Sequence, residues 1–148
     1  MVQKDANETP EFRRNFRFHP AFADFYARGL YQVGPVIPDT EYTGDPLRPG
    51  PQRRDPVTHE LVWKIAVLDP AEKHPRRKAY EVMLLSNSEP VPTTGEIGPD
   101  MRPIELTGLI VTPRVAGQGE FKYLSWVVRA TGYAPGPRTP SGPAKSGD

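Results

Sequence analysis

Apolar and polar residues alternate along several stretches of this chain, and a period of two predicts β-strands. In Leu61–Leu68, alternate positions from Leu61 to Val67 are apolar, and Lys64 falls in the opposite phase. Arg76–Ser86 follows after a short polar turn, so the two segments predict a hairpin. We expect Lys64 to point outward and the apolar set to face a core.

A second, longer hairpin is predicted later in the chain by Pro103–Val115 and Phe121–Tyr133. Leu106 and Ile110 are expected on the buried face of the first of these strands, together with Ile104. Gly108 interrupts the same strand, and a glycine in mid-strand is typical of a sharp bend. A long, kinked antiparallel strand in a small all-β chain predicts a strongly coiled, closed barrel.

The segment 12–29 is rich in aromatic residues and arginines. Aromatic spacings of three and four between Phe18 and Tyr26 predict a short helix from about Pro20 to Gly29. Two interpretations remain open. The helix packs its aromatic face against the end of the barrel, or the segment forms an aromatic–arginine strip that stacks on bases.

The 19 prolines cluster in residues 35–56, 90–103 and 135–143, which separates connections and tail from the strands. The first strand is expected within Leu30–Tyr42, bent or at an edge because Gly34 and two prolines interrupt it. The predicted organisation is a disordered tail (1–11), a helical segment (12–29), a five-stranded all-β barrel (30–134) and a disordered tail (135–148).

Five strands with a long first connection and a final hairpin resemble the OB fold. The runs DPVTHELVWKIAVLD and MRPIELTGLIVTPRVAG resemble small OB-like accessory proteins of actinobacterial plasmids and integrative elements. The resemblance covers about residues 30–135 and implies an OB-like barrel that acts beside replication or transfer proteins. The chain differs from typical OB folds because no clear helix precedes the fourth strand, and the N-terminal helix is the candidate to replace it.

Composition narrows the functional classes. The chain has no cysteine, which excludes disulfides and thiolate metal sites. We expect a cytoplasmic protein, because its N-terminus has no apolar signal core and no apolar run has the length of a membrane span. The formal net charge is only +1, so any affinity for nucleic acid must come from local clusters of charge.

The densest basic cluster is Lys73–Lys78, and Tyr80 follows it directly. In OB folds the face of the second and third strands is where single strands bind, with cations on phosphates and aromatic rings on bases. A basic hairpin rim that serves only solubility is the competing interpretation. The predicted nucleic-acid site consists of Lys64, Arg76, Arg77, Lys78, Tyr80, Lys122, Trp126, Arg53 and Arg54.

No catalytic signature is present in the sequence. His19, His59 and His74 are too scattered to chelate a metal, and no glycine-rich loop leads from a strand into a helix. We therefore expect no enzyme, metal or cofactor. The first hypothesis is a non-enzymatic protein that binds single-stranded DNA. The second is a protein-interaction module that uses the aromatic N-terminal segment or a barrel edge.

Overall fold

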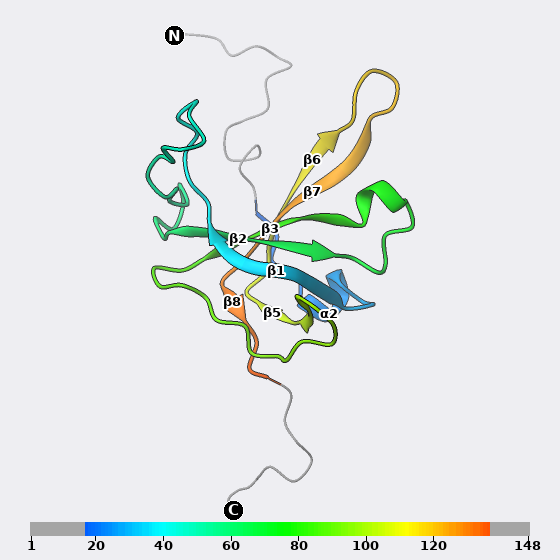
Figure 1. Ribbon diagram of the computed structural model, residues 1–148. Coiled ribbons are helices and arrows are strands. Elements are labelled where there is room, and N and C mark those ends of the chain that lie inside the picture. Colours follow the sequence, from blue (N-terminus) through cyan, green and yellow to red (C-terminus); the bar gives the residue numbers. More distant parts are fainter. Residues whose placement is uncertain (1–16, 137–148) are drawn as a thin grey trace, which may run out of the picture.

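The computed structural model describes residues 17–136, which fold mainly into β-strands (Figure 1). Six strands form a mixed sheet in the order β4-β1-β2-β3-β7-β6, and β5 and β8 form a small second sheet. The predicted β class is therefore confirmed. The elements are α2 (Phe22–Phe25), β1 (Leu30–Pro38), β2 (Val62–Leu68), the 3₁₀ helix η1 (Pro75–Arg77), β3 (Ala79–Leu85), β4 (Met101–Ile104), β5 (Leu106–Thr107), β6 (Ile110–Ala116), β7 (Tyr123–Ala130) and β8 (Gly132–Tyr133).

The two edge strands of the large sheet, β4 and β6, belong to one stretch of chain that runs through β5. The β1 strand lies between β4 and β2, so it is not at an edge. Its register against β2 shifts between Val33 and Ile37, which agrees with the irregularity predicted from Gly34. The β3 and β7 strands run parallel and pair only at Met83–Arg129 and Leu84–Ala130. The β2–β3 and β6–β7 pairs are antiparallel hairpins, as the alternation predicted.

The main core lies on one face of the hairpin β2–β3. Ile65 and Val67 of β2 and Val82 and Leu84 of β3 are almost fully buried there. Trp63 is partly buried and packs against the same core. Its indole N–H donates a hydrogen bond to the backbone carbonyl of Ser86 at 2.8 Å. The predicted inward phase of β2 is confirmed at these positions.

The predicted strand Pro103–Val115 is broken at Gly108, which has a φ of +61°. Any other residue is strained at this φ, and a Cβ at Gly108 would lie 2.5 Å from Thr131 Oγ1. Leu106 is buried in the main core, and Glu105 and Thr107 are exposed, as predicted.

Beyond the break, the alternation is shifted by one residue. Leu109 and Val111 enter the main core in place of Ile110. Ile110 is buried with Val62 and Leu85 in a small separate cluster. The prediction that Ile110 shares a face with Leu106 is therefore wrong, because the turn at the glycine inverts the phase of the strand.

The N-terminal helix is a single turn, shorter than the predicted Pro20–Gly29. Ala21 at its N-cap makes no side-chain hydrogen bond, and Gly29 follows with a φ of +78°. Tyr26 is buried in the main core, and Phe22 and Phe25 pack against that core. Packing against the core is thus the interpretation that the structure supports for these three aromatics. Phe12 and Phe16 of the predicted segment lie outside the described residues, as do the tails 1–11 and 137–148.

The connection predicted to lack a helix, Asn87–Asp100, contains none. Within residues 17–136, no helix has both the length and the apolar character that a membrane crossing requires.

Candidate functional site

A cleft opens where the β6–β7 hairpin leaves the rest of the large sheet. The parallel pair β3–β7 holds only at Met83 and Leu84, and the earlier residues of both strands diverge (Figure 1). The resulting cleft has a volume of about 560 Å³ and is lined by β3 with the preceding η1 on one side and by the hairpin on the other. The short pairing is therefore what creates the site.

Side chains of the hairpin fall on two faces because opposite residues of an antiparallel pair share a face. Val111 and Val128 are opposite each other and buried, and Trp126 and Leu124 continue this inner face outward along β7. Trp126 is 40% exposed and Leu124 is 63% exposed. The ring of Phe25 meets Trp126 edge-on at 5.8 Å between centroids. The inner face of the cleft is therefore apolar and accessible.

The outer face of the cleft carries arginines. Arg114 lies opposite Ser125 on the other face of the hairpin. Arg76 and Arg77 come from η1, where the side chain of His74 accepts a hydrogen bond from the Arg76 backbone N–H. The guanidinium carbon of Arg77 lies 3.4 Å from the centroid of the Tyr123 ring, a cation–π contact between η1 and β7.

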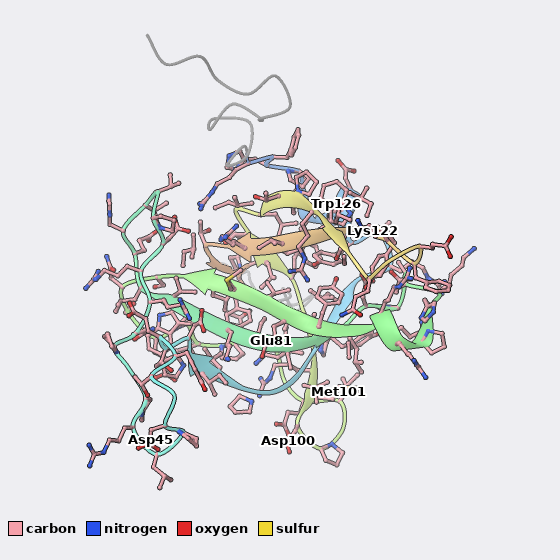
Figure 2. All side chains as sticks on the ribbon, turned by 90° about the horizontal axis from the view of Figure 1, so that it is seen from above. Asp45, Glu81, Asp100, Met101, Lys122 and Trp126 are labelled. Carbon is pink, nitrogen blue, oxygen red and sulfur yellow. The ribbon has the colours of Figure 1, made fainter. Side chains whose placement is uncertain are left out.

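The charge of the cleft is mixed, because the lining also includes Asp39, Asp69, Glu72 and Glu81. Lys64 forms an ion pair with Glu81 at 3.8 Å, across the β2–β3 hairpin. Asp39 pairs with Arg53 at 3.6 Å. Figure 2 shows Glu81 on β3, with Trp126 and Lys122 on the neighbouring hairpin. The cations do not form an uninterrupted positive groove.

Tyr80 has its ring in the cleft lining and its hydroxyl inside the protein. The hydroxyl donates to Asp69 Oδ2 at 2.9 Å and lies 3.1 Å from the Tyr26 hydroxyl. Burial, together with these neighbours, raises the pKa of Tyr80 above its ordinary value. Burial also raises the pKa of Tyr26 to about 12. Tyr80 is thus anchored in the structure and is less free to stack on a ligand than Trp126.

The predicted site residues are only partly brought together. Lys78 and Lys122 do not line the cleft. Arg53 and Arg54 line a second hollow of about 220 Å³, which shares Asp39 and Met83 with the cleft. The predicted residues that line the cleft itself are Lys64, Arg76, Arg77, Tyr80 and Trp126.

The prediction of the site omitted Tyr123, Arg114 and Phe25, which also line the cleft. Tyr123 shares a strand with Trp126, but its cation comes from η1, so spacing along β7 gives no sign of the contact. Arg114 lies next to Pro113 in β6, and its exposed position in the strand is the feature from which it could have been predicted. Phe25 was predicted to lie in the N-terminal helix, with packing and base stacking both open, and nothing in the sequence placed it beside Trp126.

The second hollow contains an ion-pair cluster that sequence reasoning also missed. Asp55 is 1% exposed, accepts two hydrogen bonds of 3.0 Å from Arg17 and lies 3.6 Å from Arg129. Burial alone raises the pKa of this carboxyl, but Arg17 and the backbone N–H groups of Thr58 and Val57 outweigh it and lower the pKa to about 2. Burial and the charge of Arg17 lower the pKa of Arg129.

This cluster fastens parts of the chain that are distant in sequence. Arg17 precedes a backbone bridge between Phe18 and Val111 of β6. Asp55 lies in the long connection between β1 and β2. The cluster therefore stabilises the arrangement of the strands, with the two guanidinium groups of Arg17 and Arg129 sharing the single carboxylate of Asp55.

Within residues 17–136, no group of three or more histidine, aspartate or glutamate side chains is arranged to hold a metal ion. No known protein family, curated protein or solved structure matches this chain significantly. The assignment of a function therefore depends on the chemistry of the cleft.

Proposed function

We propose that this protein binds single-stranded DNA at the cleft and the adjoining outer face of β2 and β3. It acts without catalysis, in the cytoplasm, as an accessory to the replication or transfer of a mobile element. The observation that carries the proposal is that Arg76, Arg77 and Arg114 line the same cleft as the exposed ring of Trp126. Guanidinium groups attract phosphates, and an accessible aromatic ring stacks on bases of any sequence.

The strand order supports an OB-like barrel as the scaffold. The segment β4–β6 counts as one strand bent at Gly108, and β7–β8 counts as another, which gives five strands in all. The first strand then pairs with the second and the fourth, and the third runs parallel to the fifth. OB folds bind oligonucleotides on the face of the second and third strands and through the adjacent loops.

The mixed charge of the cleft sets the expected strength of binding. Only a few phosphates can be neutralised, so we expect micromolar or weaker affinity and little base preference. Each phosphate contact on a single strand contributes about −0.7 to the slope of log affinity against log salt. Stacking on Trp126 contributes roughly 1–3 kcal/mol and leaves this slope unchanged, since it releases no counterions.

Fluorescence anisotropy with a labelled thirty-base oligonucleotide at several salt concentrations tests the proposal. Replacing Arg76, Arg77 and Lys78 together with alanine is expected to flatten the salt slope by roughly two units. Trp126→Ala is expected to weaken binding at every salt concentration with the slope preserved.

The matched controls are Arg28→Ala and Arg48→Ala. Both remove an exposed arginine that does not line the cleft. They are expected to change the slope by less than the triple variant. The proposal is rejected if the parent protein shows no binding at low salt, or if the triple variant binds as the parent does.

A further inference from the structure

Two strand edges face each other across the cleft without pairing. β3 is paired with β2 along its whole length, and β7 is paired with β6 from Tyr123 to Arg129. On their facing sides, however, the two strands pair only at Met83–Arg129 and Leu84–Ala130. Within residues 17–136, the ladder between β3 and β7 includes no residue of Ala79–Val82 and none of Tyr123–Val128. Backbone donors and acceptors therefore point into the cleft from both sides.

An unpaired strand edge is a template for another strand, because N–H and C=O groups alternate along it with the spacing of an extended chain. The unpaired part of β3 covers four residues, which span about 13 Å of strand. The paired residues at Met83 and Leu84 close one end of the cleft, and the contact of Arg77 with Tyr123 lies near the other.

A strand inserted between β3 and β7 would meet different residues of the cleft on its two faces. One face would meet the apolar inner side of the cleft, formed by Phe25, Leu124 and Trp126. The other face would meet the outer side, where Arg76 and Arg114 lie. Successive side chains of a strand point to opposite faces, so the cleft matches a segment with a period of two.

The outer face offers positive charge that is not neutralised internally. Among the described residues, Arg76 and Arg114 form no ion pair. Two acidic groups of the lining are in ion pairs with other cations, Glu81 with Lys64 and Asp39 with Arg53. Asp69 and Glu72 accept hydrogen bonds from the Tyr80 hydroxyl and the backbone N–H of His74 and keep their negative charge. Acidic side chains placed beside Arg76 and Arg114 would therefore complement these two guanidinium groups.

We propose that the cleft binds an extended segment of a partner protein in which acidic residues alternate with apolar ones. The segment adds as a strand between β3 and β7, with its backbone bonded to one or both free edges. Its apolar side chains contact Trp126 and Leu124, and its carboxylates contact Arg76 and Arg114. This inference does not depend on DNA binding, because it rests on the unpaired backbone.

The experiment uses the full chain and a fluorescein-labelled ten-residue peptide that alternates glutamate and leucine. Two further peptides serve as controls. The first has the same composition with all glutamates before all leucines, and the second keeps the alternating sequence but carries N-methyl groups on alternate backbone amides. We expect anisotropy to detect binding of the alternating peptide and each control peptide to bind roughly tenfold more weakly or worse. The block peptide no longer places its apolar and acidic side chains on opposite faces, and the N-methylated peptide loses backbone hydrogen bonds.

Variants of the protein locate the binding site. Ala79→Glu places a negative charge in the cleft at an exposed strand position and is expected to weaken peptide binding by about tenfold. Ala71→Glu adds the same charge to an exposed position of the same hairpin outside the cleft, and is expected to have little effect. Arg114→Ala is expected to weaken the binding of the alternating peptide as well.

The inference is overturned if the alternating peptide does not bind, or if the block or N-methylated peptide binds equally well. It is also overturned if light scattering shows a dimer that Ala79→Glu dissociates, because a second copy then occupies the cleft. Oligonucleotide binding measured on the same samples is a separate readout. DNA binding without peptide binding rejects the inference alone, and peptide binding without DNA binding rejects the proposed function alone.

Discussion

The guanidinium of Arg77 lies 3.4 Å above the ring of Tyr123, and this contact joins η1 to the start of β7 across the cleft. Among the described residues, the ladder between β3 and β7 does not extend to this end of the cleft. The position of the β6–β7 hairpin relative to β3 therefore depends on side chains at this end of the cleft and on backbone pairing at the other.

Replacing Tyr123 with leucine is expected to loosen the hairpin with little loss of global stability. A partly exposed cation–π contact contributes about 0.5–1 kcal/mol, which is small against the stability of a domain. Hydrogen exchange is expected to become faster at the amides of residues 123–126, with a small change in melting temperature. Lys122→Ala is the control, since Lys122 is exposed and does not line the cleft. Equal exchange in both variants would show that the contact does not position the hairpin.

Asp55→Asn is expected to destabilise the protein by roughly 3–5 kcal/mol, because it leaves the guanidinium groups of Arg17 and Arg129 without their buried countercharge. Chemical denaturation measures the loss. Asp45→Asn is the matched control, because Asp45 is exposed and only 3.9 Å from the exposed Arg48. A loss below about 1 kcal/mol for Asp55→Asn would mean that water replaces the carboxylate without cost.

The lowered pKa of Asp55 also leads us to expect that the stability of the protein depends on pH. Its folded-state pKa of about 2 lies below the ordinary value of 3.8, so the folded state favours the charged carboxylate. Its contribution to stability is fully present above pH 3.8 and is lost as the pH falls toward 2. The parent protein is expected to lose more stability than Asp55→Asn over this interval. Parallel curves for the two proteins would contradict the assignment.

Gly108→Ala is expected to destabilise the fold more than Gly119→Ala. The two glycines have φ values of +61° and +60°, so both changes carry the same backbone strain, of about 1–2 kcal/mol. Only at Gly108 does a Cβ meet other atoms, at 2.5 Å from Thr131 Oγ1, whereas Gly119 has open space. The difference between the two melting temperatures measures the steric part. Equal losses would show that Thr131 moves aside freely.

Tyr80→Phe separates a structural role of Tyr80 from a role in binding. The change removes a part-buried hydroxyl that bonds Asp69 and Tyr26, and it is expected to cost roughly 1–3 kcal/mol of stability. Oligonucleotide affinity is expected to remain unchanged because the ring is kept. Tyr42→Phe is the control, since Tyr42 is 87% exposed. Weaker DNA binding without loss of stability would assign the hydroxyl to the ligand instead.

Local alternation was sufficient to predict the strands β2 and β3 and the inward phase of Ile65 and Val67. It failed at Gly108, because a period of two carried through a glycine cannot detect the shift of one residue that the turn introduces. A bend at this position was predicted from the glycine, within a strand that was expected to continue to Val115. The direction of the chain after it depends on packing against Thr131, which lies far along the sequence.

Only part of the candidate site was predicted, because local sequence cannot reveal contacts between remote segments. The basic cluster before β3 follows from local sequence. Alternation along β7 did not decide which of its faces is exposed, and the structure shows Trp126 40% exposed. The contact of Arg77 with Tyr123 and the Asp55 cluster join residues of different elements, and no spacing in one segment reveals them. The unpaired edges of β3 and β7 depend on how two remote strands diverge, which is a property of the assembled sheet.

The position of β1 between β2 and β4 has a consequence for how fast the protein folds. The β2–β3 hairpin closes over a connection of ten residues (69–78), whereas Leu30 of β1 must meet Ile104 of β4, which lies 74 residues later in the chain. The entropy of closing so large a loop is lost before the strands gain any contact, and proteins with such remote pairings fold in milliseconds to seconds. We therefore expect the β2–β3 hairpin to form early and the β1–β4 pairing to limit the folding rate.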